Sequence, residues 1–142
     1  MATTLGWLLG GLILPGLTLV ASGFLVSIFQ WLVLNGRIAR PWRWVPATIA
    51  GWGLGYLISF FLLPQGLEGA VIGLTTGVAQ WVVLRREMHW AGWWIIFSLI
   101  GWTTGLTLLP GPMLTGTMAG TLTGLCLEVL LRDPRSKTSR RF

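Results

Sequence analysis

The chain alternates long apolar runs with short polar breaks. About 20 apolar residues in a helix cross a bilayer core of about 30 Å, and five runs are near that length. They cover approximately Leu12–Leu34, Trp44–Leu63, Leu67–Leu84, Ala91–Leu109 and Met113–Leu131. The breaks read "NGRIARP", "PQG", "RREMHW" and "PGP", which combine turn-forming residues with charge. The pattern predicts an all-α integral membrane protein, with one bundle of five transmembrane helices over residues 1–131 and a basic tail over residues 132–142.

The first apolar run is longer than a single crossing requires. It begins at Leu5, and Pro15-Gly16 falls inside it. Proline removes a backbone hydrogen bond and bends or ends a helix. Residues 5–15 therefore form a tilted extension, a kinked segment or a separate piece at the membrane surface, and the sequence leaves these three alternatives open.

Composition and charge favour a membrane protein and give it an orientation. Hydrophobic residues make up 54% of the chain and charged residues 10%, whereas soluble domains carry about 25% charged residues. All ten Lys and Arg residues follow the first, third or fifth apolar run. Basic loops stay in the cytoplasm, so we expect the N-terminus outside and the C-terminus inside. The net charge of +6 therefore indicates membrane orientation rather than a nucleic-acid surface.

A sequence pattern recurs at a constant offset along the chain. "QWLVLNGRIARPWRW" begins at Gln30 and "QWVVLRREMHWAGWW" at Gln80. The same offset matches Gly51-Trp52 with Gly101-Trp102 and Gly55 with Gly105. Both copies have the same orientation, so the pattern predicts a parallel duplication of a helical hairpin, unlike the inverted repeats of many transporters.

The fifth run resembles half of a third copy. Its glycines align with those of the third run when Gly116, Gly120 and Gly124 are placed on Gly69, Gly73 and Gly77. In that alignment Leu127-Glu128 replaces Gln80-Trp81.

Glycines spaced four residues apart predict close helix packing. Such residues share one face of a helix, and small residues let backbones approach where lipid supplies no hydrophobic driving force. Two alternatives remain: packing within the bundle, or contact with another subunit. The candidate packing or partner positions are Gly51, Gly55, Gly69, Gly73, Gly77, Gly101, Gly105, Gly116, Gly120 and Gly124.

Polar and aromatic residues at depth are the candidate ligand or pore residues: Gln30, Gln80, Trp52, Trp102, Glu128 and His89. An unsatisfied amide in hydrocarbon costs several kcal/mol, so we expect the two glutamines to form an interhelical hydrogen bond or to line a path. Glu128 either pairs with Arg132 at i,i+4 or binds a proton or cation. His89 is a solvated loop residue or an axial cofactor ligand. The two mid-helix tryptophans pack in the core or stack on a lipid tail or pigment ring.

The other tryptophans lie beside the arginines and predict an aromatic belt at the inner membrane boundary. These are Trp31, Trp42, Trp44, Trp81, Trp90, Trp93 and Trp94.

Few residues are available for catalysis. The chain has one His, one Cys and four acidic residues, and it contains no zinc, nucleophile-triad or phosphate-loop motif. The lone lysine, Lys137, lies in the tail, which excludes a mid-membrane Schiff base. We therefore expect no enzyme and no metal site.

The repeated pattern "G…G..QWVVLR…WW…GW..G" resembles uncharacterised multi-pass membrane proteins of cyanobacteria and related bacteria. This resemblance implies a bacterial inner membrane, or a thylakoid membrane if the source is phototrophic, and it implies no mechanism. Two functions are expected from the sequence. The first is a non-enzymatic accessory or scaffold subunit of a larger membrane complex, photosynthetic or respiratory, with lipid, chlorophyll or carotenoid as candidate ligands. The alternative is a small oligomeric permease or channel whose path is lined by Gln30, Gln80 and Glu128.

Overall fold

The structure, a computed structural model, describes residues 5, 6, 9, 18–62, 64, 66–108 and 112–132. Five long α-helices follow one another in the described part of the chain. They are α2 (Thr18–Leu34), α3 (Trp44–Leu62), α4 (Glu68–Leu84), α5 (Trp93–Thr103) and α6 (Pro112–Arg132). A 3-10 turn, η2 (Pro41–Arg43), leads into α3, and a π-helical segment, η3 (Thr104–Leu108), extends α5. The predicted all-helical architecture is present.

The helix boundaries follow the apolar runs closely. Helix α4 begins one residue after the predicted start, α5 begins two residues after it, and α6 is one residue longer at each end. Three predicted boundaries of the apolar runs, Leu12, Leu63 and Leu109, lie outside the described residues. The charged and turn-forming breaks therefore set the helix ends, as the pattern predicted.

The N-terminal segment folds back onto α2. A Cβ atom placed on Gly6 would lie 2.5 Å from the backbone nitrogen of Val26. In a straight helix these residues would be about 30 Å apart, at about 1.5 Å per residue. A straight tilted extension of α2 is therefore wrong for the described part of this segment. A kinked segment and a separate piece remain as alternatives.

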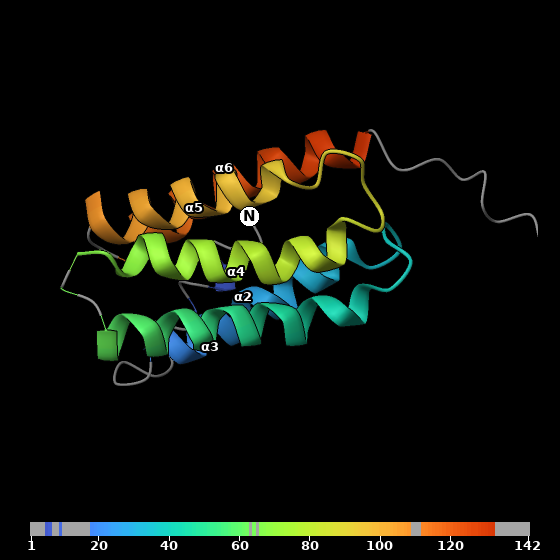
Figure 1. Ribbon diagram of the computed structural model, residues 1–142. Coiled ribbons are helices and arrows are strands. Elements are labelled where there is room, and N and C mark those ends of the chain that lie inside the picture. The colour runs from blue at the N-terminus through green and yellow to red at the C-terminus, as the bar shows by residue number, and fades with distance from the viewer. Residues whose placement is uncertain are drawn as a thin grey trace, which may run out of the picture.

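The five helices pack antiparallel, each against the next one in the chain (Figure 1). The turns after α2 and α4 and the end of α6 lie at one end of the bundle, which we call the basic end. The α3–α4 turn and the start of α6 lie at the opposite end (Figure 1). All described arginines thus gather at one end, because each basic segment follows a helix that runs in the same direction.

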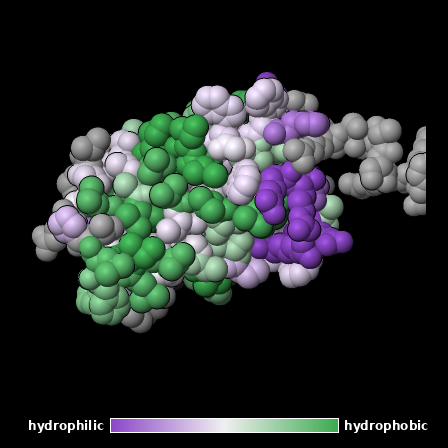
Figure 2. All heavy atoms as spheres, viewed as in Figure 1, coloured by the Kyte–Doolittle hydropathy of each residue, from purple (hydrophilic) through white to green (hydrophobic). Residues whose placement is uncertain are grey.

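The surface is apolar and the interior contains many polar side chains. Figure 2 shows hydrophobic residues over most of one face and hydrophilic residues at the basic end. Phe60, Phe61 and Leu62 are 69%, 71% and 74% exposed. The buried polar residues are Ser27, Gln30, Thr48, Ser59, Thr76, Gln80, Ser98, Thr115 and Thr123. The core also contains buried hydrophobic residues, but exposed large apolar side chains together with buried amides are unusual for soluble domains.

One helical stretch of the described chain, Pro41–Leu62, is long and apolar enough to cross a membrane by length and composition. Two shorter apolar helices, Gly23–Leu34 and Glu68–Leu84, fall below that length.

The two hairpins contain equivalent hydrogen bonds at their turns. The backbone nitrogen of Asn35 donates to the carbonyl oxygen of Trp31 over 2.8 Å, and that of Arg85 donates to Trp81, at the equivalent place in the second copy, over 2.8 Å. The backbone nitrogen of Arg37 also donates to the carbonyl oxygen of Leu34 over 2.9 Å. The equivalent bond in the second copy runs from Glu87 to Leu84, again over 2.9 Å. The sequence repeat therefore has a local structural counterpart in the same chain direction.

Candidate functional site

A glutamine–tryptophan hydrogen bond occurs once in each hairpin. The indole nitrogen of Trp44 donates to Oε1 of Gln30 over 3.0 Å, joining α3 to α2. The indole nitrogen of Trp94 donates to Oε1 of Gln80 over 2.8 Å, joining α5 to α4. All four side chains are buried. The sequence separation of Gln and Trp is the same in both copies, so each hairpin is closed by the same polar contact.

A second set of bonds joins the two hairpins to each other. The side-chain nitrogen of Gln80 donates to Oε1 of Gln30 over 3.1 Å and to the hydroxyl of Thr48 over 2.9 Å. The Thr48 hydroxyl in turn donates to the carbonyl oxygen of Trp44 over 2.9 Å. The predicted interhelical bond between the two glutamines is thus confirmed. A buried network of this kind is stable only when its members are satisfied.

Tryptophan pairs related by the repeat pack against each other. Trp44 and Trp94 meet edge to face with ring centroids 5.5 Å apart. Trp52 and Trp102 do the same at 4.6 Å, and both are nearly fully buried. The mid-helix pair is therefore used for core packing, which was one of the two alternatives. Each ring edge carries partial positive charge and faces the partner's electron-rich face, which favours this geometry.

The belt interpretation is wrong for Trp44 and Trp94. Both are essentially inaccessible, at 0% and 1% exposure, because their indole N–H groups bond to the glutamines. Trp42, Trp90 and Trp93 are 61%, 63% and 52% exposed at the basic end, as a belt requires. Hydrophobicity and position cannot separate the two groups, since both lie beside the same arginines.

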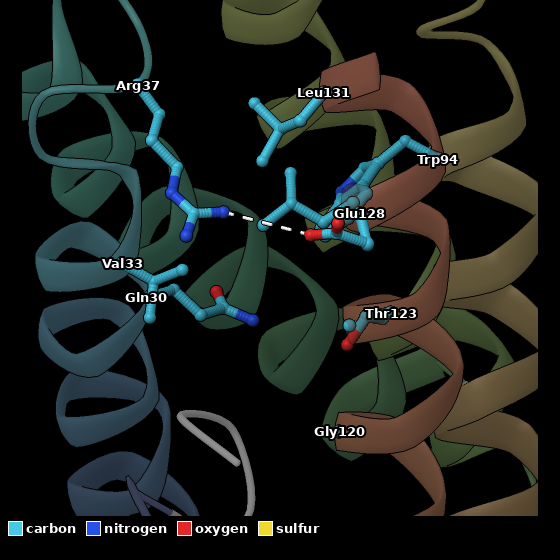
Figure 3. A pocket seen from close by; sticks show the side chains of 10 residues that line it. Gln30, Val33, Arg37, Trp94, Gly120, Thr123, Glu128 and Leu131 are labelled. Carbon is cyan, nitrogen blue, oxygen red and sulfur yellow. Dashed lines mark ion pairs between the residues drawn. The ribbon is translucent and has the colours of Figure 1, made fainter.

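A cleft opens between α2 and α6 (Figure 3). Its volume is about 180 Å³. In Figure 3 the side chain of Gln30 points from α2 toward α6, where Gly120 and Thr123 lie opposite. At the basic end, Arg37 in the turn after α2 reaches Glu128 of α6, with 3.8 Å between Nη1 and Oε2. The cleft thus has polar and apolar side chains on both walls, and an ion pair closes one mouth.

Glu128 pairs with two arginines. Besides Arg37, its Oε1 lies 3.5 Å from Nη2 of Arg132, the i,i+4 partner expected from the sequence. The Glu128 side chain is 55% exposed. Exposed pairs of this kind contribute about 0–1 kcal/mol. Gln80, by contrast, lies in the buried network and does not line the cleft, so the three proposed path residues are not together.

Seven of the candidate glycines, in α3, α4, α5 and η3, face neighbouring helices of the same chain. A Cβ atom at Gly73 would lie 2.8 Å from the carbonyl oxygen of Ser98, and Gly69 likewise abuts Trp102. Gly77 meets α5 as well, while Gly51 and Gly55 meet α4, and Gly101 and Gly105 meet α6. These seven positions serve packing within the bundle. The exposed Gly124 differs, because a Cβ atom there would meet nothing within 4 Å.

The register of α6 differs from the sequence alignment by one helical turn. Gly51 faces Thr76 and Ala79, whereas Gly101 faces Ala119 and Leu122. The contacts therefore make Ala119 the structural equivalent of Thr76, whereas the sequence alignment made Thr123 its equivalent. In the contact register Thr123 occupies the place of Gln80, and Glu128 that of Arg85. The alignment was wrong because glycines recur every four residues, so a one-turn shift leaves them on the same face.

The last candidate, His89, lies apart from the network, as does Glu68. His89 is exposed in the turn between α4 and α5. Glu68, at the start of α4, accepts a hydrogen bond from the backbone nitrogen of Gly66 over 2.8 Å and so holds the preceding turn against that helix end. The described residues contain no group of His, Cys, Asp or Glu side chains able to hold a metal ion.

No protein family, curated protein or solved structure matches the chain.

Sequence reasoning missed the partners of the glutamines. Thr48 and the two buried tryptophans were not placed with Gln30 and Gln80. A signal was present, since the same Gln–Trp separation recurs in both copies. Across a short turn, that separation brings side chains of two antiparallel helices to the same level.

Proposed function

We propose that the chain is an integral membrane protein with five spanning helices, a parallel duplicated hairpin plus a half repeat. The basic end faces the cytoplasm, which places the start of α2 outside. The main support is that large apolar residues such as Phe60 and Phe61 are exposed while the amides of Gln30 and Gln80 are buried. Monomeric soluble proteins rarely expose contiguous apolar patches of more than a few hundred Å². The segregation of arginines to one end supports the orientation.

Within the membrane, we propose a non-enzymatic accessory subunit that binds a helix of a larger complex in the α2–α6 cleft. Gly77 of α4 packs against α5 at Ile95 and Ser98. Its structural equivalent on α6 is Gly120, which lines the cleft. The cleft therefore occupies, beside α6, the place that α5 occupies beside α4. This relationship carries the proposal, because a glycine face lets a helix approach closely.

The proposed setting is a bacterial inner membrane, or a thylakoid membrane in a phototroph, with a photosynthetic or respiratory complex as partner. This setting is proposed from the resemblance of the repeated pattern to multi-pass membrane proteins of cyanobacteria and related bacteria. Chlorophyll and carotenoid gain no support from Trp52 and Trp102, because those rings pack on each other. Lipid remains the better supported ligand class, given the exposed apolar surface.

Photo-cross-linking tests the cleft directly. A photoreactive residue at Val33, which lines the cleft and is 41% exposed, should capture another polypeptide. The same residue at Leu32, 52% exposed but outside the cleft, is the matched control and should give much less product. Equal products from both sites, or products that return only to the same chain, would remove the accessory-subunit proposal.

Glycine substitution provides a second test. Gly124→Leu and Gly53→Leu both place a side chain in space that this chain leaves open. Co-migration with the larger complex on a native gel should fail only for Gly124→Leu, because Gly53 lies on the exposed face of α3. Unchanged migration of both variants contradicts docking at α6.

A small permease remains the second candidate, and the cleft itself favours it. Gln30, Thr123 and Glu128 line one continuous space. The absence of Gln80 from that space and the Arg37–Glu128 pair across its mouth make it the weaker proposal. Osmotic swelling of proteoliposomes in glycerol tests it. Swelling faster than that of empty vesicles, and faster again for Glu128→Ala, would favour the permease over the subunit.

A further inference from the structure

Two surface grooves lie at the basic end, one at each seam between consecutive hairpins. The first, which we call the Arg groove, has a volume of about 380 Å³ and lies between the α2–α3 turn and the end of α4. It is lined by Ala39, Arg40, Arg43, Val82, Val83, Arg86 and Glu87. The second, the Trp groove, has a volume of about 710 Å³ between α5 and α6. It is lined by Trp90, Trp93, Phe97, Leu125, Cys126, Val129 and Leu130.

The two grooves occupy equivalent positions in the repeat. Trp90 and Trp93 are the repeat equivalents of Arg40 and Arg43. On the other wall, the register of α6 established by its glycine contacts places four residues of the Trp groove on four of the Arg groove. Leu125, Cys126, Val129 and Leu130 correspond in that order to Val82, Val83, Arg86 and Glu87. The fold thus forms this groove twice, once with three arginines and once with only apolar and aromatic side chains.

The arginines of the first groove lack an acidic partner among the described residues. Both ion pairs among the described residues are formed by Glu128, which lies on α6. Glu87, the one carboxylate lining the groove, forms an ion pair with none of the three guanidinium groups. The balance of three arginines and one glutamate leaves a charge of +2 in the groove. Arg43 also lies over the ring of Trp42, 5.2 Å from its centroid, which restricts its position.

The wall below the arginines is apolar. Val82 and Val83 lie one turn before Arg86 on α4, on the side away from the basic end, and Val82 is 42% exposed. A ligand that fits both parts has an anionic head and an apolar tail. Guanidinium groups bind phosphate through paired hydrogen bonds, and basic pockets on the cytoplasmic side of membrane helices suit anionic lipid headgroups.

We propose that the Arg groove binds the phosphate of an anionic phospholipid from the cytoplasmic leaflet, with an acyl chain along Val82. This inference rests on the proposed membrane location. The Trp groove occupies the same depth and offers no charge, so it accepts lipid without selecting the headgroup. Selectivity for anionic lipid therefore depends on Arg40, Arg43 and Arg86.

Native mass spectrometry of the full chain tests the proposal. The protein is reconstituted in nanodiscs of equal parts phosphatidylglycerol and phosphatidylcholine, and the retained lipid is identified after release. Phosphatidylglycerol should be enriched on the wild-type protein. Arg86→Gln should lower its retention about fivefold, since one basic residue near an anionic surface is worth about that factor.

Arg85→Gln is the matched control. Arg85 is adjacent in sequence and carries the same charge, but it lies over the Trp81 ring, 5.1 Å from its centroid, and does not line the groove. It should retain phosphatidylglycerol at nearly the wild-type level. An equal loss in Arg85→Gln would show general attraction to a negative surface and overturn the site. If soluble glycerol phosphate displaced the bound phospholipid and bound with the same affinity, the lipid would be excluded as the specific ligand.

Alkaline carbonate extraction separates failure of this inference from failure of the proposed function. Protein that stays in the membrane pellet but shows no preference for phosphatidylglycerol refutes the lipid site alone. Protein released by carbonate refutes the membrane location, and the lipid site with it.

Discussion

The side-chain nitrogen of Gln80 donates a hydrogen bond to Oε1 of Gln30, its repeat equivalent, over 3.1 Å. This bond crosses from the second hairpin to the first. It connects two Gln–Trp contacts of identical spacing into one network, and Thr48 accepts a second bond from the same nitrogen. The two buried amides are thus paired with each other across the repeat, and the network fixes how the two hairpins pack.

Replacement of Gln80 by leucine should destabilise the protein by about 1–3 kcal/mol, the cost of a buried donor left without its acceptor. The orphaned donor is the indole nitrogen of Trp94. Equilibrium unfolding in detergent measures the change. Val78→Ala, at a 40% exposed position on the same helix, is the control and should change stability little.

A double-mutant cycle identifies the cause. Trp94→Phe removes the donor that Gln80→Leu leaves unpaired, so the double variant should be more stable than the sum of the single changes predicts. Strict additivity would show that the loss arises from packing rather than from the hydrogen bond.

The sequence predicted the helices and one bond of the network for physical reasons. Apolar runs bounded by charge determine helix length, and a buried amide requires a partner, so the Gln30–Gln80 bond followed from the repeat. The burial of Trp44 did not follow, because a belt tryptophan and a core tryptophan can have the same neighbours in sequence. Its depth depends on how α3 rotates toward Gln30, which only the packed structure shows.

The register of α6 and the grooves needed three-dimensional contacts. Glycines spaced four residues apart stay on the same helix face after a one-turn shift, so the glycine spacing alone does not fix the register of α6. The contact between Gly101 and Ala119 selects one of them. The Arg groove likewise depends on the start of α3 meeting the end of α4, segments separated by a full helix pair in the chain.

Neutralisation of Glu128 should have a small effect on stability. Glu128→Gln removes ion pairs with Arg37 and Arg132, whose side chains are 52% and 76% exposed. Water and salt screen such pairs, so we expect a loss below about 1 kcal/mol, smaller still at high ionic strength. Thermal unfolding at two salt concentrations measures it. A loss of several kcal/mol would mean that the pair is buried in the functional assembly.

The orientation can be measured by cysteine labelling in a Cys126→Ala background, since Cys126 is buried and the chain has no other cysteine. Asn35→Cys lies at the basic end and Leu67→Cys at the far end, and both positions are exposed. In intact spheroplasts a membrane-impermeant maleimide should label Leu67→Cys only. Asn35→Cys should react after the membrane is permeabilised. The reverse pattern contradicts the cytoplasmic basic end.

Leucine at Gly73 should damage the fold itself, because this glycine packs against α5 of the same chain. A Cβ atom there would lie 2.8 Å from the carbonyl oxygen of Ser98 and 3.0 Å from the Cα atom of Leu99, and backbone atoms of α5 cannot move aside easily. Such overpacking typically costs about 1–3 kcal/mol. Gly53→Leu adds the same side chain to open space, and it should be neutral or stabilising, because glycine weakens a helix by up to about 1 kcal/mol. Unfolding of both variants in detergent, without any partner present, decides the matter. A Gly73→Leu monomer as stable as wild type would mean that α4 and α5 are not held in close contact, and that the Gly69/Gly73/Gly77 face is available to another polypeptide.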